Sequence, residues 1–536
     1  MLNKEDVWGN SVTEFFDYAE EKEQLLWSYL FEQLIEVTPR SYKKQILPSI
    51  EKIGEKSFRK TIHNWLEIVI LAKPKTAFYE DESGLEHERN YLLEYPNEII
   101  FARLIRTLPF VADQNSIDLL SELAIEAGKN RTFKDNDKTN KTDKINKITG
   151  IASYKLSEQA IFALADIEKS NTKPNPITAL LSIQIQLQSL SLKSLIEKKL
   201  AQIAKKQKIE VIDLLENHLP DYGLESGFLE GEIQSKLNPE KMYVYQMQVI
   251  ENKVKLTWFD NNGKELKTVP AALKREFSHK IEKLKSTAIE AQKTLTLQRE
   301  RLEKTYLTQK QFTYSHWKNV YANHGLLEVV VENLVWQIEI NTEEGKKWKT
   351  VWSSFGRFID REKQPIEAKD DTEIRLLHPV LLSQNELEYW QEFIKQKDIK
   401  QPFQQVFRTV FERVETGEKE IEESNRFEGI ILSQKKLKMF AKIQGWNYKW
   451  LMYPKMNRSF VTFQFDYKID DSAKATKLEI EFWVEALPSQ PQNVKTSVIR
   501  LHKKAQSMSF ELLDKVTFSE IFRAIQRIIA VSSNTD

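Results

Sequence analysis

The chain has 536 residues, 41% of them hydrophobic, so it can bury the cores of roughly three or four domains. It contains no cysteine, which excludes disulfides, thiolate metal sites, cysteine nucleophiles and iron–sulfur clusters. Its 79 basic and 78 acidic residues nearly cancel, so net charge does not favour nucleic acid or a membrane surface. The charged N-terminus lacks a signal-peptide core and no apolar run is long enough for a membrane span, which predicts a cytoplasmic protein without membrane contact.

The first part of the chain has the pattern of consecutive helices. Up to about residue 128, apolar residues recur at helical spacing and no strand pattern interrupts them. Gly128 stands where a helix C-cap would. Helical patterns resume at residue 157 and end in a turn at residues 220–223. Residues 1–228 therefore predict an all-α region of HEAT-like helical pairs.

One segment inside this region has a different composition. Residues 130–148 consist almost entirely of Lys, Asn, Asp and Thr, so they can bury little apolar surface. We expect a disordered loop there. A solvated linker is a better interpretation of its lysines than a contact with nucleic acid.

The pattern changes at Met242. Over residues 242–270 apolar and polar residues alternate around Asn262–Gly263, which predicts a β-hairpin. A long helix is expected over residues 271–309. Its polar face offers a candidate interaction surface that includes Lys280, Lys283, Arg299 and Arg301. Acidic residues are interspersed on that face, so paired charges in solvent are a simpler interpretation than binding to phosphates.

Further strands and helices follow. Strands are expected within residues 326–360, and a helix begins after Ser383, which can form a capping box with Glu386. A second helix is expected over residues 401–414. Together with the hairpin and the long helix, these elements predict an α+β domain over residues 242–415.

The last part of the chain predicts another α+β domain, over residues 424–536. Three alternating segments favour strands, and residues 518–533 have the pattern of a final helix. The fold class expected for the whole chain is α+β and multidomain: an all-α N-terminal region, then mixed α/β modules with antiparallel sheet and one long helix.

From about residue 209 onward, short motifs occur in a fixed order. They are LPDYGLE (219–225), the hairpin with Trp258 and Pro270, QRERLE (298–303), LVW (334–336), RLLHPV (375–380), QPFQQVFR (401–408), RFEGIIL (426–432), EFWVE (481–485) and FSEIFR (518–523). In this series they resemble the bacterial domain-of-unknown-function family 4132, which includes molybdate-metabolism-regulator-like (MolR) proteins. The chain departs from longer relatives because Trp8-Gly9-Asn10 is not their WGR module, and because FRAIQRII replaces a more acidic terminal run.

The resemblance implies an accessory or scaffold role and no established activity. Genes of this family often lie near those of MoxR-type AAA ATPases and von Willebrand-A-type proteins. It therefore implies a protein partner of one of these two types.

Several polar residues lie inside the family-like stretches and beside aromatic residues. The candidate pocket consists of His378, Gln404, Arg408, Arg426, Glu481, Glu485 and Arg523. In the predicted helix 401–414, two of them fall four positions apart on one face. The sequence contains no phosphate-binding glycine loop, no zinc-type histidine pair and no serine-hydrolase elbow, so we assign no catalytic residue, cofactor or metal.

The EFWVE strand and the tryptophans are the other candidates. Glu479, Glu481, Trp483 and Glu485 fall on one face of the strand, where they would bind a cation, a basic peptide or a sugar, or would simply face solvent. Trp446 and Trp483 are candidates for an interaction surface because tryptophan is enriched at binding hot spots.

Three hypotheses follow. The favoured one is a non-enzymatic scaffold or adaptor that offers a concave helical face and a second docking surface. The second is an uncharacterised enzyme or nucleotide-sensing domain in the C-terminal half, which requires the candidate pocket residues to converge. The third is a nucleic-acid accessory protein that uses the lysine-rich loop and the basic helix.

Overall fold

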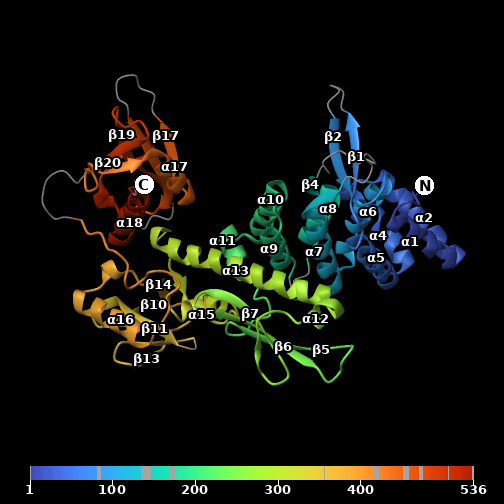
Figure 1. The fold of residues 1–536 in the computed structure, drawn as a ribbon, viewed down its shortest axis with the longest axis horizontal. Coiled ribbons are helices and arrows are strands. Elements are labelled where there is room, and N and C mark those ends of the chain that lie inside the picture. Colours follow the sequence, from blue (N-terminus) through green and yellow to red (C-terminus); the bar gives the residue numbers. More distant parts are fainter. Residues whose placement is uncertain are drawn as a thin grey trace. The chain divides into compact units, whose positions relative to one another are not determined.

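A computed structural model describes residues 2–80, 86–134, 147–168, 175–308, 310–354, 356–413, 422–450, 458–469, 475–504 and 506–533. The chain divides into two compact units, Met1–Pro220 and Asp221–Asp536 (Figure 1). The expected α+β multidomain class is confirmed: the first unit is mainly helical and the second contains antiparallel sheets. Among the described residues, no helix is both long and apolar enough to cross a membrane.

Unit 1 is built from helices that pack on one another around a continuous apolar core. The core of its N-terminal part is aromatic, since Trp8, Trp27 and Trp65 are buried and Trp65 meets the other two edge to face. The helices are α1 (Val7–Tyr18), α2 (Glu21–Glu36), α3 (Tyr42–Gln45), α4 (Leu47–Ile53), α5 (Glu55–Ile70), α6 (Asn97–Ile105), α7 (Gln114–Gly128), α8 (Tyr154–Asp166), α9 (Pro176–Gln186), α10 (Leu190–Gln207) and α11 (Val211–Asn217).

Two β-hairpins interrupt these helices, so the prediction of an all-α region is wrong in detail. β1 (Lys75–Glu80) pairs with β2 (Glu86–Tyr91), and β3 (Asn130–Lys134) pairs with β4 (Lys147–Ile151), both antiparallel. Their strands have five or six residues each, and apolar and polar side chains do not alternate regularly along them, so they lack the pattern that marks a strand in sequence. The ends of the loop predicted at 130–148 therefore form strands, and its middle lies outside the described residues.

Gly128 is not the predicted C-cap. It is the last residue of α7, and Lys129 follows it in an extended conformation. A Cβ at residue 128 would lie 2.7 Å from side-chain atoms of Ser157 and Leu187. The glycine is therefore explained by close packing of α7 against the following helices.

A polar tie holds the N-terminus to α6. Asp6 caps α1 by accepting from Gly9 N at 2.7 Å, and its second oxygen accepts from Glu94 N at 2.7 Å and Asn97 Nδ2 at 2.9 Å. The backbone of Asn3 forms two further hydrogen bonds with the fully buried amide of Asn97. Asp6 therefore accepts hydrogen bonds both from its own helix and from residues about 90 positions further along the chain.

Unit 2 begins with an antiparallel sheet of order β5-β6-β7-β8. The Asn262–Gly263 turn joins β7 to β8 as predicted, but a second turn at Glu251–Asn252, both with positive φ, joins β6 to β7. The sequence pattern predicts a single hairpin turn, whereas the structure contains two. The strands are β5 (Phe228–Gln234), β6 (Met242–Ile250), β7 (Lys253–Phe259) and β8 (Glu265–Leu266).

The long helix predicted at 271–309 is broken in two. α12 (Ala271–Glu276) ends because Phe277 leaves the helical conformation, and α13 (Ser278–Thr308) then runs for 31 residues. At 1.5 Å per residue, α13 is about 46 Å long. One end packs on β7 and the other reaches the C-terminal helix of this unit (Figure 1).

The middle sheet has the order β13-β12-β11-β10-β14-β9. The capping box of Ser383 and Glu386 is confirmed at the start of α16, whereas the first residues of the stretch predicted as strand form the short helix α15. The elements are β9 (Phe312–Thr313), α14 (Tyr314–Trp317), α15 (Glu328–Val331), β10 (Val335–Thr342), β11 (Gly345–Ser354), β12 (Arg357–Ile359), β13 (Pro365–Ile366), β14 (Glu373–Leu376) and α16 (Gln384–Gln396).

The C-terminal sheet has the order β15-β20-β19-β18-β17, and β16 and β21 also pair with β20. α17 and α18 pack on one face, where alternate residues of the strands are buried, as the alternation in sequence predicts. The elements are β15 (Glu423–Ser424), β16 (Ile431–Ser433), α17 (Gln434–Ile443), β17 (Asn447–Trp450), β18 (Arg458–Tyr467), β19 (Thr476–Ala486), β20 (Asn493–Lys503), β21 (Gln506–Met508) and α18 (Lys515–Ser532).

Replacing Asp6 with Ala should destabilise unit 1 by about 2–3 kcal/mol, because the change removes a helix cap and leaves the buried amide of Asn97 short of an acceptor. Urea unfolding followed by circular dichroism measures this change. Asp17→Ala, at an exposed position of the same helix, is the matched control. Equal unfolding midpoints for the two variants would contradict the assigned role of Asp6.

Candidate functional site

Helix α18 places two charged side chains in an apolar environment. Asp514 caps the helix by accepting from Val516 N at 2.8 Å and Thr517 N at 3.1 Å. Glu520 and Arg523 are three positions apart, so they lie on the same side of the helix, and both are buried. Because a buried charge is costly without a partner, the surrounding segments must supply opposite charges and hydrogen bonds.

One such segment is the stretch of residues 401–413, which we call the strap. It contains neither helix nor strand, so the helix predicted at 401–414 is wrong. Beside a few local hydrogen bonds, its polar groups bond to segments far away in the chain. The buried Gln405 side chain accepts from Val335 N at 2.8 Å and donates to Val335 O at 2.7 Å and Leu377 O at 3.0 Å. These bonds extend the edge of β10 beyond the end of β14.

The strap presents Arg408 to α18. Its guanidinium is fully buried and binds both carboxylate oxygens of Glu520, with Nε at 2.6 Å and Nη2 at 2.5 Å. Nη2 also donates to Glu303 at 2.8 Å, and Nη1 donates to the backbone oxygen of Gln404 at 2.6 Å. The guanidinium carbon lies 4.9 Å from the centre of the Tyr306 ring. Arg408 thus makes a bidentate, charge-assisted contact in a buried environment.

His378 completes the contacts of Glu520. Val380 N lies 3.1 Å from Nδ1, which must therefore accept, so Nε2 carries the proton and donates to Glu520 at 3.1 Å. The ring also meets Tyr306 edge-on at 5.0 Å. The Tyr306 hydroxyl donates to Leu377 O at 2.7 Å. Both nitrogens of the buried imidazole are occupied by protein groups.

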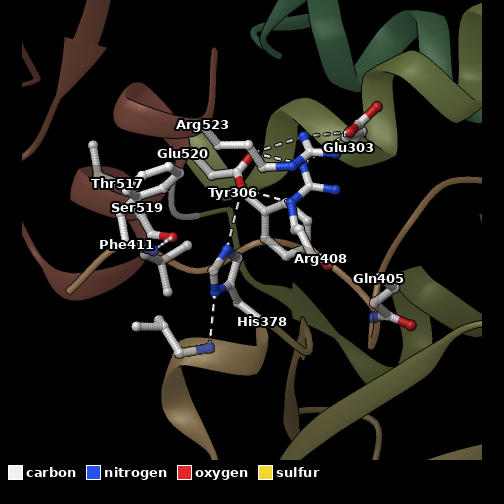
Figure 2. A network of polar contacts seen from close by, with 12 residues as sticks. Glu303, Tyr306, His378, Gln405, Arg408, Phe411, Thr517, Ser519, Glu520 and Arg523 are labelled. Carbon is white, nitrogen blue, oxygen red and sulfur yellow. Dashed lines mark hydrogen bonds and ion pairs between the residues drawn. The ribbon is translucent and has the colours of Figure 1, made fainter. Parts of the chain in front are cut away.

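Arg523 and Glu303 form the outer edge of the group. Arg523 Nη1 lies 3.4 Å from a Glu303 oxygen and 4.0 Å from a Glu520 oxygen. The Glu303 side chain is 26% exposed, whereas that of Arg408 is 0% exposed. Figure 2 shows these side chains converging from α13, the strap, α18 and the segment after β14. We call the five residues the Glu520 clasp: Glu303, His378, Arg408, Glu520 and Arg523.

The electrostatics of the clasp favour fixed charges. Burial would raise the pKa of Glu520, but hydrogen bonds from Arg408 and His378 and the charge of Arg408 outweigh it and lower the pKa to about 2. Burial lowers the pKa of His378, so the imidazole is neutral. At neutral pH the clasp holds two arginines, two glutamates and a neutral histidine, with no net charge. Such an arrangement joins chain segments and does not provide Glu520 as a proton carrier.

The remaining pocket candidates lie outside the clasp. Gln404 contributes its backbone oxygen. Arg426 donates to Glu412 O at 2.8 Å and lies over the Phe411 and Phe522 rings, at 5.7 and 5.4 Å. It secures the end of the strap to α18. Of the predicted pocket, His378, Arg408 and Arg523 are therefore brought together by their side chains.

Glu481 and Glu485 lie on the other face of β19, away from its buried residues. Glu481 accepts from Trp483 Nε1 at 2.9 Å and lies 3.2 Å from His502 Nε2. Glu485 forms an ion pair with Arg458 at 2.7 Å on the neighbouring strand. Both carboxylates are thus paired with groups of the same sheet face.

The two tryptophan candidates differ in exposure. Trp446 is buried, 3% exposed, and stacks on Phe463 at 5.3 Å. Trp483 is half-buried and packs on Phe460 at 4.5 Å. Only Trp483 presents part of its ring to solvent.

The basic candidates on α13 also divide into two groups. Lys280 and Lys283 are exposed. Arg299 is half-buried and donates to Pro402 O at 2.8 Å, so it pins the start of the strap. Arg301 is half-buried and bonds to a neighbour on its own helix. The four side chains therefore do not form one uniform cationic surface.

Sequence reasoning missed the acidic and aromatic parts of the clasp, Glu303, Tyr306 and Glu520. A signal was present for Glu520, which is the one carboxylate between Lys515 and Ser532 and lies next to Phe518, Ile521 and Phe522. An unpaired acid at such a position indicates a buried cation elsewhere in the chain. Nothing in the sequence indicates which cation.

Unit 1 contains a second polar cluster, formed by His63, Ser116 and Asp113. His63 Nε2 lies 2.8 Å from Ser116 Oγ, and Ser116 Oγ donates to Asp113 at 3.0 Å. Asn115 Nδ2 lies 3.1 Å from His63 Nδ1, so Nε2 carries the proton and donates to the serine. A serine nucleophile needs the opposite direction of proton donation. The cluster is the capping box of α7, reinforced by His63.

Comparison with known proteins relates part of the chain to a family. Residues 263–446 match the family model described as Domain of unknown function (DUF4132). This segment is about a third of the chain and includes α13, the middle sheet, the strap and α17. The expected family resemblance is confirmed for this segment. No curated protein and no solved structure matches the chain.

Glu520→Gln should destabilise unit 2 by about 3–5 kcal/mol, because it leaves the buried charge of Arg408 without its main partner. Denaturant unfolding followed by tryptophan fluorescence measures the change. Glu362→Gln removes an acid from an exposed ion pair with Arg361 and should leave the unfolding midpoint unchanged. Equal midpoints for both variants would show that the clasp does not hold the fold.

The clasp also predicts that stability falls with acid. The pKa of Glu520 and that of His378 are both lower in the folded protein than their ordinary values of 4.5 and 6.5, so the unfolded chain binds more protons as the pH falls. Stability should therefore decrease below about pH 6.5 and further below about pH 4.5. Measuring the urea midpoint from about pH 8 to about pH 3 checks this. The Glu520→Gln variant should show a shallower loss below about pH 4.5; a slope identical to that of the unchanged protein would contradict the assignment.

Proposed function

We propose that the protein is a non-enzymatic scaffold or adaptor in a multi-protein system. The observation that carries the proposal is the Glu520 clasp, in which the polar groups of His378, Arg408 and Glu520 are bonded to one another or to the backbone. Residues that would otherwise suggest a reactive centre are used to join α13, the strap and α18. A buried ionic group of this kind favours one arrangement of segments over others.

A scaffold needs a surface of fixed shape, and the strap supports this in unit 2. Arg299 fixes its start, Gln405 and Arg408 its middle, and Arg413 its end, through a bond to Leu513 O at 3.0 Å. The strap thereby connects the middle sheet to α18. The surfaces on both sides of the strap therefore keep a fixed position relative to each other, which favours binding of a partner without rearrangement.

The helical unit supports the proposal in a different way. Leu25 and Tyr29 lie one turn apart on α2 and are 66% and 51% exposed. Exposed apolar side chains that share a helix face are typical of protein contact surfaces. We interpret the helical pairs of unit 1 as HEAT-like and as the first docking surface.

The partner comes from the family resemblance. An AAA ATPase or a von Willebrand-A-type protein is the proposed partner, in a bacterial cytoplasm, and the molybdate-metabolism-regulator-like name belongs to the same proposal. Protein docking needs neither a cofactor nor a metal.

Affinity capture of the tagged full-length protein from its native host at low salt, with mass spectrometry, tests the proposal. We expect a stoichiometric AAA ATPase or von Willebrand-A-type protein. Its recovery should fall at least about tenfold with either Leu25→Glu/Tyr29→Glu or Glu520→Gln, according to the unit it contacts. Glu362→Gln is the matched control. Recovery of no stoichiometric protein, or of nucleic acid alone, would overturn the scaffold assignment.

A further inference from the structure

Helix α17 divides its side chains sharply between core and solvent. Leu437 and Ala441 are fully buried against the C-terminal sheet and α18. On the opposite side, Met439 is 50% exposed and Ile443 is 65% exposed. Ile431, on the strand that leads into the helix, is 45% exposed. Apolar side chains thus remain outside after the core of the unit is complete.

These apolar residues lie in a row with a lysine. Lys435, Met439 and Ile443 follow one another at intervals of four, so they lie along one line on the helix surface. Lys438 and Lys442, both exposed, form the adjacent line. We call this surface, formed by Lys435, Lys438, Met439, Lys442 and Ile443, the α17 face.

The charge of the α17 face is one-sided. The helix from Gln434 to Ile443 contains four lysines and no acidic residue. In the described parts of the chain, no ion-pair partner is placed on Lys435, Lys438 or Lys442, and Lys438 lies over the Tyr448 ring at 4.7 Å.

On the outer sheet face of the same unit the pattern is different. Lys449 is paired with Glu479 and Arg458 with Glu485. On that face, these basic residues thus pair with acids of the same sheet, whereas the three lysines of the α17 face do not have such partners among the described residues. Its lysines are left to pair with acids from another molecule.

We propose that the α17 face is a docking surface for an acidic, amphipathic helix of a partner protein. This inference rests on the proposed scaffold function and names the chemistry of one partner contact. The partner helix would place apolar side chains on Met439 and Ile443, and carboxylates opposite Lys435, Lys438 and Lys442. An apolar anchor surrounded by complementary charges is the common arrangement of a helix-binding surface.

Two other classes of partner fit this face less well. Nucleic acid would be bound by cations together with aromatic platforms, whereas this row exposes methionine and isoleucine. A membrane surface would require a wide apolar face to insert, but Leu437 and Ala441 are already in the core. Two exposed apolar side chains are enough to anchor a helix and too few to anchor a protein in a bilayer.

Fluorescence anisotropy with a synthetic probe tests the proposal on the full-length protein. The probe is a fluorescein-labelled peptide of about four helical turns, with leucine at every fourth position and glutamates on both sides. A second peptide of equal charge has serine in place of leucine. We expect the leucine peptide to bind at least about tenfold more tightly than the serine peptide.

Two variants of the α17 face provide the comparison. Lys435→Glu/Lys438→Glu/Lys442→Glu and Met439→Ser/Ile443→Ser should each weaken binding of the leucine peptide at least about tenfold. Lys274→Glu/Lys283→Glu/Lys285→Glu changes the charge equally at exposed positions of α12 and α13 and should leave binding within about twofold. Because all these positions are exposed, unchanged thermal unfolding will show that the variants fold.

The outcomes separate this inference from the scaffold proposal. Absence of binding, equal binding of both peptides, or equal affinity of the α17 variants and the control would overturn the α17 face. So would tighter binding of anionic vesicles or duplex DNA that is lost in the same variants. If the peptide binds as expected but capture from the host yields no stoichiometric protein, the scaffold proposal fails while the surface stands.

Discussion

The contact between Arg408 and Glu520 determines how unit 2 is held together. Removing two charges from water is costly, and the cost is offset here by bidentate geometry, by a second carboxylate and by a histidine that donates to the same oxygen. Because each member needs the others, the segments that carry them cannot shift independently. The long helix α13, the strap and α18 are therefore held together as one rigid unit.

This dependence explains why the strap is irregular. A helix over residues 401–413 would have satisfied its backbone internally and would have turned Gln405 and Arg408 in directions set by helical spacing. In the structure, Gln405 reaches the edge of β10 while Arg408 reaches α18. The apolar pattern of the strap resembles that of a helix because Phe403, Val406 and Phe407 occur at helical intervals. Tertiary hydrogen bonds outweigh this local preference for a helix.

The predictions that succeeded rest on local signals. The Asn262–Gly263 turn, the capping box of Ser383 and Glu386, and the alternation along β19 can be read from neighbouring residues, and the structure contains all three. The Glu520 clasp was only partly accessible. His378, Arg408 and Arg523 could be selected as polar residues beside aromatics, but their common partner is 112 residues from Arg408 and 142 from His378. No local pattern encodes a pairing at that distance. The hairpins of unit 1 were missed for another reason: their strands are short, and apolar and polar residues do not alternate regularly along them.

The long separation between the partners has a consequence for synthesis of the chain. The ribosome synthesises the middle sheet and the strap well before α18. Arg408 and His378 therefore lack the carboxylate of Glu520 until α18 has been made. During that interval Arg408 lacks its bidentate partner and the apolar residues that α18 covers stay exposed, and transiently exposed apolar surface is prone to aggregation. Synthesis of α18 is therefore the step that closes the clasp: until Glu520 is in place, the partly exposed carboxylate of Glu303 is the acidic partner of Arg408.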